Sequence, residues 1–333
     1  MEMLSTSGSD LEKAAAALTA GLLVAFPTET VYGLGGDAFN PAALAKIFEA
    51  KNRPRFDPLI IHIAEMNTLP RIMDKSSLNR TTRERLSILT EQLWPGPLTL
   101  ILPKHPEVPG LATAGLVTAA VRFPSHPVAQ KLIRLSTGAI AAPSANPFGF
   151  LSPTKAEHVK NQLGERVDFI VDGGRAEIGL ESTVLDITQD SPLILRLGGT
   201  SRETIEELIG PVVISLTSAP EAPVSPGQLK NHYAPRTPLV VYTPGKLDTT
   251  APVPGEGRLY FSPPKYVKIP RERTRILSET SNMTEAAANF FDKLHELDGL
   301  GLTILRAEEA PNTGLGEAIN DRLRKASNAL IPP

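Results

Sequence analysis

An apolar run that stops at a polar, glycine-containing segment most constrains the fold of this chain. Residues 22–26 (LLVAF) are all apolar, and residues 27–34 (PTETVYGL) add hydroxyls, one carboxylate and one phenol. A short apolar run bounded in this way is typical of a buried strand. In an open α/β sheet, small ligands are held where strands end. The segment therefore predicts a sheet with a ligand site at the end of this strand.

Other strand-like runs in the first part of the chain end in the same way. They are expected at 59–63, 98–102, 117–123, 139–142, 169–171, 183–187 and 194–197. Helical patterns are expected at 9–20, 40–50, 83–93, 128–135, 155–163 and 201–209. Because strands and helices do not alternate strictly, we predict an α/β fold with a twisted, mixed sheet flanked by helices.

Three helices carry recognisable start signals. Ser9 and Glu12 have the spacing of a capping box, in which each side chain satisfies a backbone N–H group of the first turn. Asn40, directly before Pro41, predicts an N-cap with proline at the first helical position. Ser152, just ahead of the helix at 155–163, is a further N-cap candidate.

The composition of the chain changes after residue 209, where prolines become frequent. Nine prolines fall between residues 211 and 254, which predicts an extended connector. Within it, 225–235 (SPGQLKNHYAP) carries Lys, His and Tyr, which are poor choices for a merely flexible spacer. Strand-like runs at 239–242, 258–261, 275–277 and 301–305 follow, with amphipathic helices at 284–297 and 315–327. We therefore predict a large α/β domain at 7–209, a linker at 210–237 and a small α/β domain at 238–333.

The composition excludes several classes of function. The 333 residues carry 34 Lys+Arg against 36 Asp+Glu, a net charge of −2, whereas generic nucleic-acid binding favours a basic excess. There is no cysteine, so disulfides, thiolate nucleophiles and Cys-based zinc sites are ruled out. We expect no membrane association, because no apolar run approaches the roughly 20 residues that a membrane helix needs. A polar N-terminus without a signal-peptide pattern leads us to expect a cytoplasmic protein.

Lys51 and Arg53 lie at the end of the helix predicted to begin at Asn40. Cations at a helix C-terminus often interact only with the helix dipole and solvent. Alternatively, they bind phosphate, for which Arg is a bidentate partner. There is no Gly-x-x-x-x-Gly-Lys-Ser/Thr loop, so a nucleotide would not be held by a P-loop. Asp57 follows, either as a turn residue or near the same ligand.

His62 and Arg122 each lie in an otherwise apolar strand. A lone histidine in such a strand is usually a hydrogen-bonded core residue, although its place soon after Lys51 and Arg53 suggests the same cleft. A buried arginine needs a partner, either a structural carboxylate or a substrate carboxylate. Thr118 is four residues earlier, on the same face of the strand.

Polar groups also end the later strands. Ser144 and Asn146 follow small residues that would let the backbone approach a ligand, Ser182 enters one strand, and Arg196 leaves another. We find no Ser-His-Asp set, no paired-carboxylate pattern and no metal-ligand spacing. The residues thus predict a cationic, hydroxyl-rich cleft that acts by positioning charged ligands and stabilising charge.

In combination, these segments resemble the family of L-threonylcarbamoyladenylate synthases in its long form. The matching segments are PTETVYGL at 27–34, Lys51-x-Arg53, PLIIHI at 58–63, WPGPLT at 94–99, VRFP at 121–124, APSAN at 142–146, ESTV at 181–184, and SPG and HYAP within 225–235. The resemblance covers essentially the whole chain. It implies a YrdC-like catalytic domain, a linker that closes as a lid, and a Rossmann-like C-terminal α/β domain.

The resemblance also implies a reaction. L-threonine, bicarbonate and ATP, with Mg²⁺, would give threonylcarbamoyl-AMP and pyrophosphate. A downstream tRNA-modifying transferase complex would consume the product to form threonylcarbamoyladenosine. The family pattern places threonine near Thr30, His62, Arg122, Ala142 and Ser182. Lys51 and Arg53 would be the catalytic pair, and the pattern does not assign the metal ligands. The residues placed near ATP are Lys51, Arg53, Asp57, Thr118, Ser144, Asn146, Ser152, Arg196, His232 and Tyr233.

One position departs from the family pattern, and two other classes of protein share the YrdC-like core. Family members often have Asn where this chain has Asp57, and a carboxylate would repel phosphates unless it helped to hold magnesium.

An RNA-binding module is one alternative function, since YrdC-like domains present a basic concave face, and we retain a weak RNA contact as an expectation. A carbamoyl-transfer domain of the hydrogenase-maturation type is the other, but its zinc-finger region requires cysteine.

Overall fold

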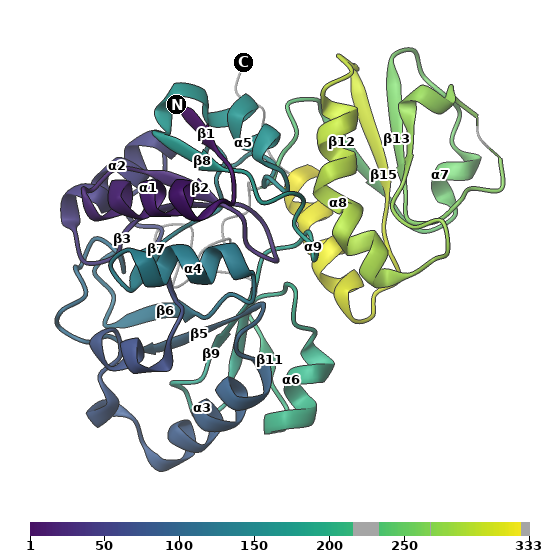
Figure 1. The fold of residues 1–333 in the computed structure, drawn as a ribbon. Helices are drawn as coiled ribbons and strands as arrows, with labels where there is room; N and C mark the ends of the chain where they lie inside the picture. The colour runs from purple at the N-terminus through teal and green to yellow at the C-terminus, as the bar shows by residue number, and fades with distance from the viewer. Residues whose placement is uncertain (216–232, 267, 328–333) are drawn as a thin grey trace.

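The computed structural model describes residues 1–215, 233–266 and 268–327, which form a large and a small lobe (Figure 1). The described strands up to Ile214 make one sheet of 11 strands, and the remaining strands make a second sheet of 4. Helices α8 and α9 of the small lobe lie on the side that faces the large lobe (Figure 1). The predicted α/β fold class is confirmed.

The large lobe contains both parallel and antiparallel pairs. Its strands are β1 (Glu2–Leu4), β2 (Val24–Phe26), β3 (Gly33–Asp37), β4 (Ile60–Ile63), β5 (Leu98–Pro103), β6 (Thr118–Arg122), β7 (Ala139–Ala141), β8 (Phe169–Val171), β9 (Thr183–Asp186), β10 (Leu193–Arg196) and β11 (Val213–Ile214). Their order is β1-β8-β2-β3-β7-β4-β6-β5-β9-β10-β11. Its α-helices are α1 (Gly8–Thr19), α2 (Pro41–Lys51), α3 (Arg80–Leu93), α4 (Pro127–Leu135), α5 (Ala156–Leu163) and α6 (Arg202–Ile209), with short 3₁₀ turns at Met66–Arg71, Lys75–Ser77 and Gly164–Arg166.

The register of the central strands brings polar residues together. On β4 and β6, which run parallel, His62 is opposite Arg122. On the antiparallel pair β5 and β6, Arg122 is opposite Thr99. Neighbouring positions in register point to the same face of a sheet. These three side chains therefore form one row across the sheet.

Strand β3 is a departure from the sequence prediction, which assigned no strand to residues 33–37. Its sequence, GLGGD, has little intrinsic preference for a strand. A Cβ atom added at Gly35 would lie 2.8 Å from both Ile140 and Phe26, so only glycine allows this close strand packing. Strand β1 was also missed, because it is only 3 residues long and mostly exposed.

Helix starts agree with the sequence where the cap is well defined. Asn40 caps α2 by accepting hydrogen bonds from the backbone N–H groups of Ala42 and Ala43, as predicted. The capping box at Ser9 was wrong, because Ser7 caps α1 and accepts from the N–H of Asp10. The N-cap assigned to Ser152 was also wrong, since the residue before α5 is Lys155, which makes no side-chain cap.

The small lobe is a parallel sheet covered by helices. Its strands are β12 (Leu239–Tyr242), β13 (Glu256–Tyr260), β14 (Thr274–Ile276) and β15 (Ile304–Glu308), in the order β12-β15-β13-β14. Its helices are α7 (Lys246–Thr249), α8 (Met283–Asp298) and α9 (Leu315–Ser327), with a 3₁₀ turn at Arg271–Arg273. Most of the predicted linker, 210–237, lies outside the described residues.

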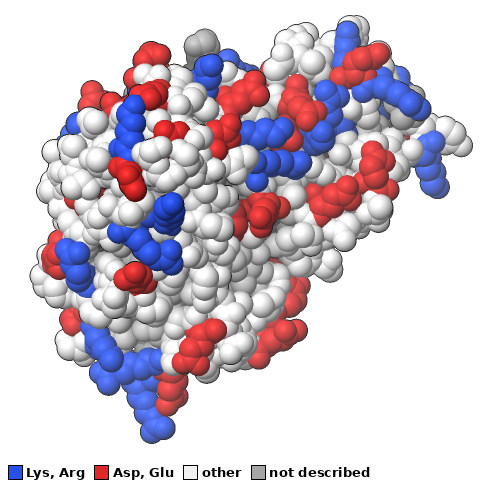
Figure 2. All heavy atoms as spheres, in the orientation of Figure 1, with Lys and Arg blue, Asp and Glu red and all other residues white. Residues whose placement is uncertain are grey.

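Charged side chains are mixed over the visible surface. On the face drawn in Figure 2, acidic and basic residues are interspersed on both lobes.

Among the described residues, no helix is both long enough and apolar enough to cross a membrane.

Candidate active site

A small cavity lies where several strands of the large sheet end. Its lining residues come from distant parts of the chain: Thr28, Thr30, Val31, Gly33, Arg53, Ile60, His62, Arg122, Ala142, Pro143, Ser144, Glu181, Ser182, Arg196 and Tyr233. Its volume is about 40 Å³, room for only a few water molecules.

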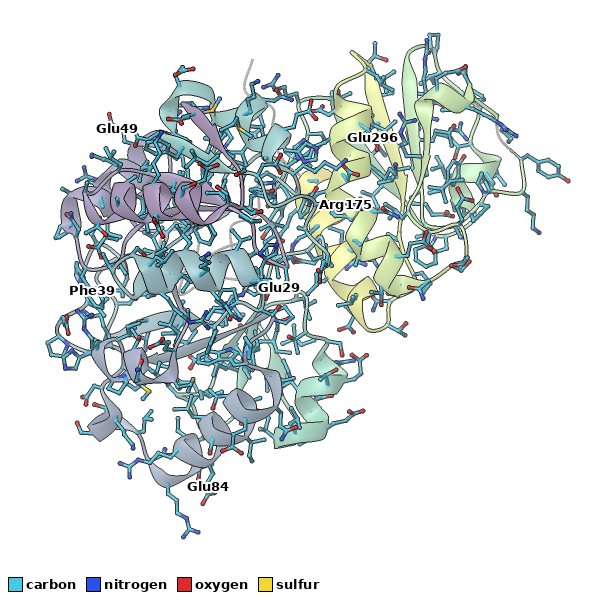
Figure 3. All side chains as sticks on the ribbon, in the orientation of Figure 1. Glu29, Phe39, Glu49, Glu84, Arg175 and Glu296 are labelled. Carbon is cyan, nitrogen blue, oxygen red and sulfur yellow. The ribbon has the colours of Figure 1, made fainter. Side chains whose placement is uncertain are left out.

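Arg122 and Glu29 form one wall through a buried ion pair. Arg122 Nη2 lies 2.6 Å from Glu29 Oε1, and both side chains are almost fully buried. Arg122 also donates from Nη1 to Thr30 Oγ1 at 2.8 Å. Burial alone would raise the pKa of Glu29, but the Arg122 guanidinium outweighs it and holds that pKa below its usual value. The structural carboxylate expected as one alternative for Arg122 is thus Glu29, which is labelled in Figure 3.

His62 lies beside Arg122 as a neutral ring. Burial, and then the nearby Arg122 charge, lower its pKa to about 3. Its Nδ1 is 3.2 Å from the carbonyl oxygen of Ile60. Because a carbonyl only accepts, Nδ1 carries the proton and Nε2 remains an acceptor. His62 is therefore both a hydrogen-bonded core residue and part of the cavity wall.

Arg196 and Ser182 form a second part of the cavity wall. Arg196 donates from Nη2 to Ser182 Oγ and from Nε to Ser182 O, both at 3.0 Å. The Ser182 hydroxyl also lies 2.7 Å from Thr99 Oγ1. Thr99, which the sequence reasoning missed, therefore links this wall to the row formed by Arg122 and His62.

Lys51 and Arg53 are buried, which excludes a solvated helix end. The Lys51 ammonium donates to the carbonyl oxygens of Ser144 and Asn146. Arg53 pairs with Asp57 at 2.9 Å and donates to the carbonyl of Pro58 at 2.8 Å. Burial lowers the pKa of Lys51 and raises that of Asp57. Asp57 thus serves as the counter-ion of Arg53, and of the two cations only Arg53 lines the cavity.

Arg322 of the small lobe contacts two residues of the cavity wall, Glu181 and Tyr233. Arg322 of α9 lies with Nε 3.1 Å from Glu181 Oε2, while Ser152 Oγ donates to the other oxygen of Glu181. The guanidinium of Arg322 lies over the ring of Tyr233, 4.8 Å from its centre. Tyr233 is buried and has a φ of 66°, a conformation rare for a bulky residue. Nothing in the sequence marked Arg322, since charged residues are expected throughout an amphipathic helix.

The structure brings together most of the residues predicted for the site. Thr30, His62, Arg122, Ala142, Ser182, Arg53, Ser144, Arg196 and Tyr233 line the cavity. Lys51, Asp57, Asn146 and Ser152 lie behind it, in contact with lining residues or their neighbours. Thr118 lies at the opposite end of β6 from Arg122, away from the cavity lining. His232 lies outside the described residues, and within the described parts of the chain no cluster of three metal-ligating side chains occurs.

Comparison with known proteins identifies the family. The Sua5/YciO/YrdC profile, described as telomere recombination, matches residues 16–198, and the profile of the threonylcarbamoyl-AMP synthase C-terminal domain matches residues 200–328. The threonylcarbamoyl-AMP synthase of Bacillus subtilis (strain 168) is 41% identical over 337 residues, covering 98% of this chain and 96% of that protein. The chain belongs to the threonylcarbamoyl-AMP synthase family.

Structures of a relative agree with this membership. The threonylcarbamoyl-AMP synthase of Pyrococcus abyssi (strain GE5 / Orsay) is 40% identical over 96% of this chain and 94% of that protein. A crystal structure of P. abyssi Sua5 complexed with L-threonine has a TM-score of 0.88 and 38% identity, covering 98% of both chains. A P. abyssi variant with an adjacent histidine and tyrosine replaced by alanine has a TM-score of 0.85 and 37% identity, covering 98% of this chain and 96% of that one.

The threonylcarbamoyl-AMP synthase family accounts for both lobes. The match extends through the C-terminal domain, which the hydrogenase-maturation alternative does not explain. The predicted family and fold are confirmed. The assignment of single residues to threonine or ATP stays a prediction.

Proposed function

We propose that this protein makes threonylcarbamoyl-AMP from L-threonine, bicarbonate and ATP, with release of pyrophosphate. The observation that supports the proposal is the lining of one cavity by three arginines and several hydroxyls: Arg122, which is paired with Glu29, and the further cations Arg53 and Arg196. An amino acid needs a cation for its carboxylate and polar groups for its hydroxyl, and a triphosphate needs further cations. Membership in the family supplies the reaction that joins them.

On the threonine side, Arg122 holds the substrate carboxylate. Its contacts with Glu29, Thr30 and the carbonyl of Gly96 leave two of the five guanidinium N–H groups for a ligand. Neutral His62 accepts a hydrogen bond from the substrate amine at Nε2 without repelling it. Ala142, directly after β7, offers backbone groups, as the family pattern implies.

On the nucleotide side, Arg53 and Arg196 face the phosphates. Both are buried, and a charge that is shielded from water acts more strongly on a developing negative charge. Lys51 lies behind the wall and fixes the loop of Ser144 and Asn146 through their carbonyl oxygens. Asp57 balances Arg53, so its carboxylate is directed at a cation and away from the phosphates.

The chemistry then requires no protein nucleophile. The threonine amine captures bicarbonate to give a carbamate and water. A carbamate oxygen attacks the α-phosphorus of ATP. The bond between the α-phosphorus and the oxygen that bridges it to the β-phosphate breaks, and pyrophosphate leaves with that electron pair. Mg²⁺ would accompany ATP and would neutralise negative charge on the phosphates as the pyrophosphate leaves.

Tyr233 contacts the nucleotide, as the family pattern implies, while its neighbour His232 lies outside the described residues. Tyr233 lines the cavity and Ala234 donates from its N–H to the carbonyl of Gly149 at 2.8 Å, so the end of the linker is anchored at the site. The P. abyssi variant lacking an adjacent histidine and tyrosine concerns the same type of pair, and this chain has one such pair. We further propose a cytoplasmic reaction whose product passes to a tRNA-modifying transferase complex, with at most weak RNA contact.

The test is an omission assay for pyrophosphate release. We expect release to require ATP, threonine and bicarbonate together, and to stop when threonine is left out. The Arg122→Lys variant should raise the KM for threonine about tenfold, because Lys cannot make the bidentate contact. The control is Arg134→Lys, at a half-exposed position. Pyrophosphate release that persists at the full rate without threonine would contradict the proposed function.

A further inference from the structure

Arg322 is a fully buried cation that the small lobe contributes to the large lobe. Its exposed fraction is 0%, and its Nη2 donates to the carbonyl of Leu197 at 2.7 Å. Its Nε pairs with Glu181, and its Nη1 pairs with Asp321 at 2.8 Å. Two carboxylates therefore balance its charge, and three separate groups fix its planar fork.

The partners of Arg322 are the chain neighbours of predicted ligand residues. Glu181 directly precedes Ser182, and Leu197 directly follows Arg196. Ser182 and Arg196 are themselves joined by two hydrogen bonds of 3.0 Å. A displacement of Arg322 would therefore move both sides of this wall at once.

Arg322 also holds the end of the linker. Tyr233 packs between the Arg322 guanidinium and the ring of Phe291, whose centre is 5.9 Å away, and both residues belong to the small lobe. A left-handed φ in a bulky residue persists only when the surroundings fix it. The small lobe supplies those surroundings.

We infer that Arg322 is a positioning residue for the reaction: it holds Glu181, Leu197 and Tyr233. Ser182 on the threonine side, and Arg196 and Tyr233 on the nucleotide side, thereby keep one geometry. The role of the C-terminal lobe is then to add Arg322 to an active-site wall that Thr99 and Ser152 also hold from within the large lobe. Arg322 itself touches no substrate in this account. The inference rests on the proposed function, because its effect is measured on that reaction.

The test compares Arg322→Lys with a matched control on the same helix. Lysine keeps the positive charge and loses the three-way fork. The control is Arg324→Lys, because Arg324 is 58% exposed and pairs only with Glu309 among the described residues. We expect Arg322→Lys to lower kcat/KM for ATP by about tenfold to a hundredfold, as for a misplaced catalytic geometry. Arg324→Lys should stay within about twofold of the wild type, as expected for a surface pair.

A double-variant cycle separates positioning from a general loss of structure. If Arg322 acts through Glu181, Arg322→Lys combined with Glu181→Gln should be little worse than the poorer single variant. Circular dichroism at the assay temperature checks that each protein is folded. Should Arg322→Lys not be folded, Glu181→Gln carries the test, because the same account requires a comparable loss in that variant.

The inference is overturned if Arg322→Lys is folded and nearly as active as the wild type, or if the two losses multiply independently. A near-normal rate for Glu181→Gln would overturn it as well. Failure of the proposed function would look different, since the wild type would then release no threonine-dependent pyrophosphate. In that event the same proteins are compared by their Kd for ATP alone, where Arg322→Lys is still expected to bind more weakly than Arg324→Lys.

Discussion

Arg122 can face a buried cavity because Glu29 neutralises it. The two residues are each 3% exposed, and an unpaired charge buried to this extent would destabilise the folded protein. The pair leaves part of the guanidinium for a ligand while holding the rest still. A fixed cation of this kind positions a carboxylate without having to reorganise when the ligand arrives.

Glu29→Gln should destabilise the protein, because it leaves Arg122 buried without its counter-ion. We expect the free energy of unfolding to fall by about 3 kcal/mol, the lower end of the range for breaking a buried pair. Urea unfolding measures the change. Glu65→Gln is the control: Glu65 is exposed and lies 3.8 Å from Arg134, so the change should stay below about 0.5 kcal/mol. Equal effects of the two substitutions would contradict the account.

His62 makes stability depend on pH in a defined direction. Its pKa is about 3 in the folded protein and 6.5 when the ring is free, so the unfolded chain binds more protons between these values. The stabilisation is complete above pH 6.5 and is lost as the pH falls toward 3. Between pH 6.5 and 4, His62→Gln should therefore lose less stability than the wild type, by up to about 1.4 kcal/mol per pH unit. Parallel stability curves for the two proteins would show that His62 is not responsible.

At the scale of elements, the end of α2 directs Arg53 toward the cavity. Asn52 adopts a left-handed conformation with a φ of 52°, and the N–H of Arg53 bonds back to the carbonyl of Phe48 at 2.9 Å. This turn reverses the chain directly after Lys51. Both cations thereby point inward from one helix end.

Substitutions at Asn52 should separate backbone conformation from side-chain chemistry. Asn52→Ala is expected to cost about 1 kcal/mol of stability and to reduce turnover, because alanine resists a positive φ. Asn52→Gly should be close to neutral in both, since glycine adopts this conformation freely. Thermal unfolding and pyrophosphate release are the measurements. A glycine variant as impaired as the alanine variant would mean that the Asn52 side chain, rather than the turn, matters.

Elements with strong local signals could be predicted from the sequence. The cap at Asn40 and the amphipathic helix Leu315–Ser327 are examples, as is β4, whose residues are all apolar except His62. Strand β3 could not be predicted, because its glycines are required by contacts with Phe26 and Ile140 and have no local preference for a strand. Polar residues at strand ends indicated the site, but not which of them pair.

At the scale of the whole molecule, buried polar contacts join the lobes. Asp292 of α8 is buried and lies 2.7 Å from Lys155 Nζ and 3.8 Å from Arg175 Nη1, both in the large lobe. Figure 3 labels Arg175 at this junction. His158 and His295 stack across it with ring centres 3.9 Å apart, and burial lowers the pKa of each ring.

These contacts explain why the residues that the small lobe contributes to the site could not be predicted from the sequence. Arg322 and Glu181 are 141 residues apart, and neither belongs to a motif that indicates the other. Asp292 likewise reads as one more charged residue on an amphipathic helix. Their pairing follows from how the lobes dock, which local patterns do not encode.

The most direct test of the central claim follows the carbon of bicarbonate through the reaction. The protein is incubated with ATP, threonine and ¹³C-labelled bicarbonate, and the products are separated and weighed by mass spectrometry. We predict an adenylate that carries both threonine and the labelled carbon, formed in equal amount with pyrophosphate. An adenylate without the label, or pyrophosphate with no threonine-containing adenylate, would contradict the account.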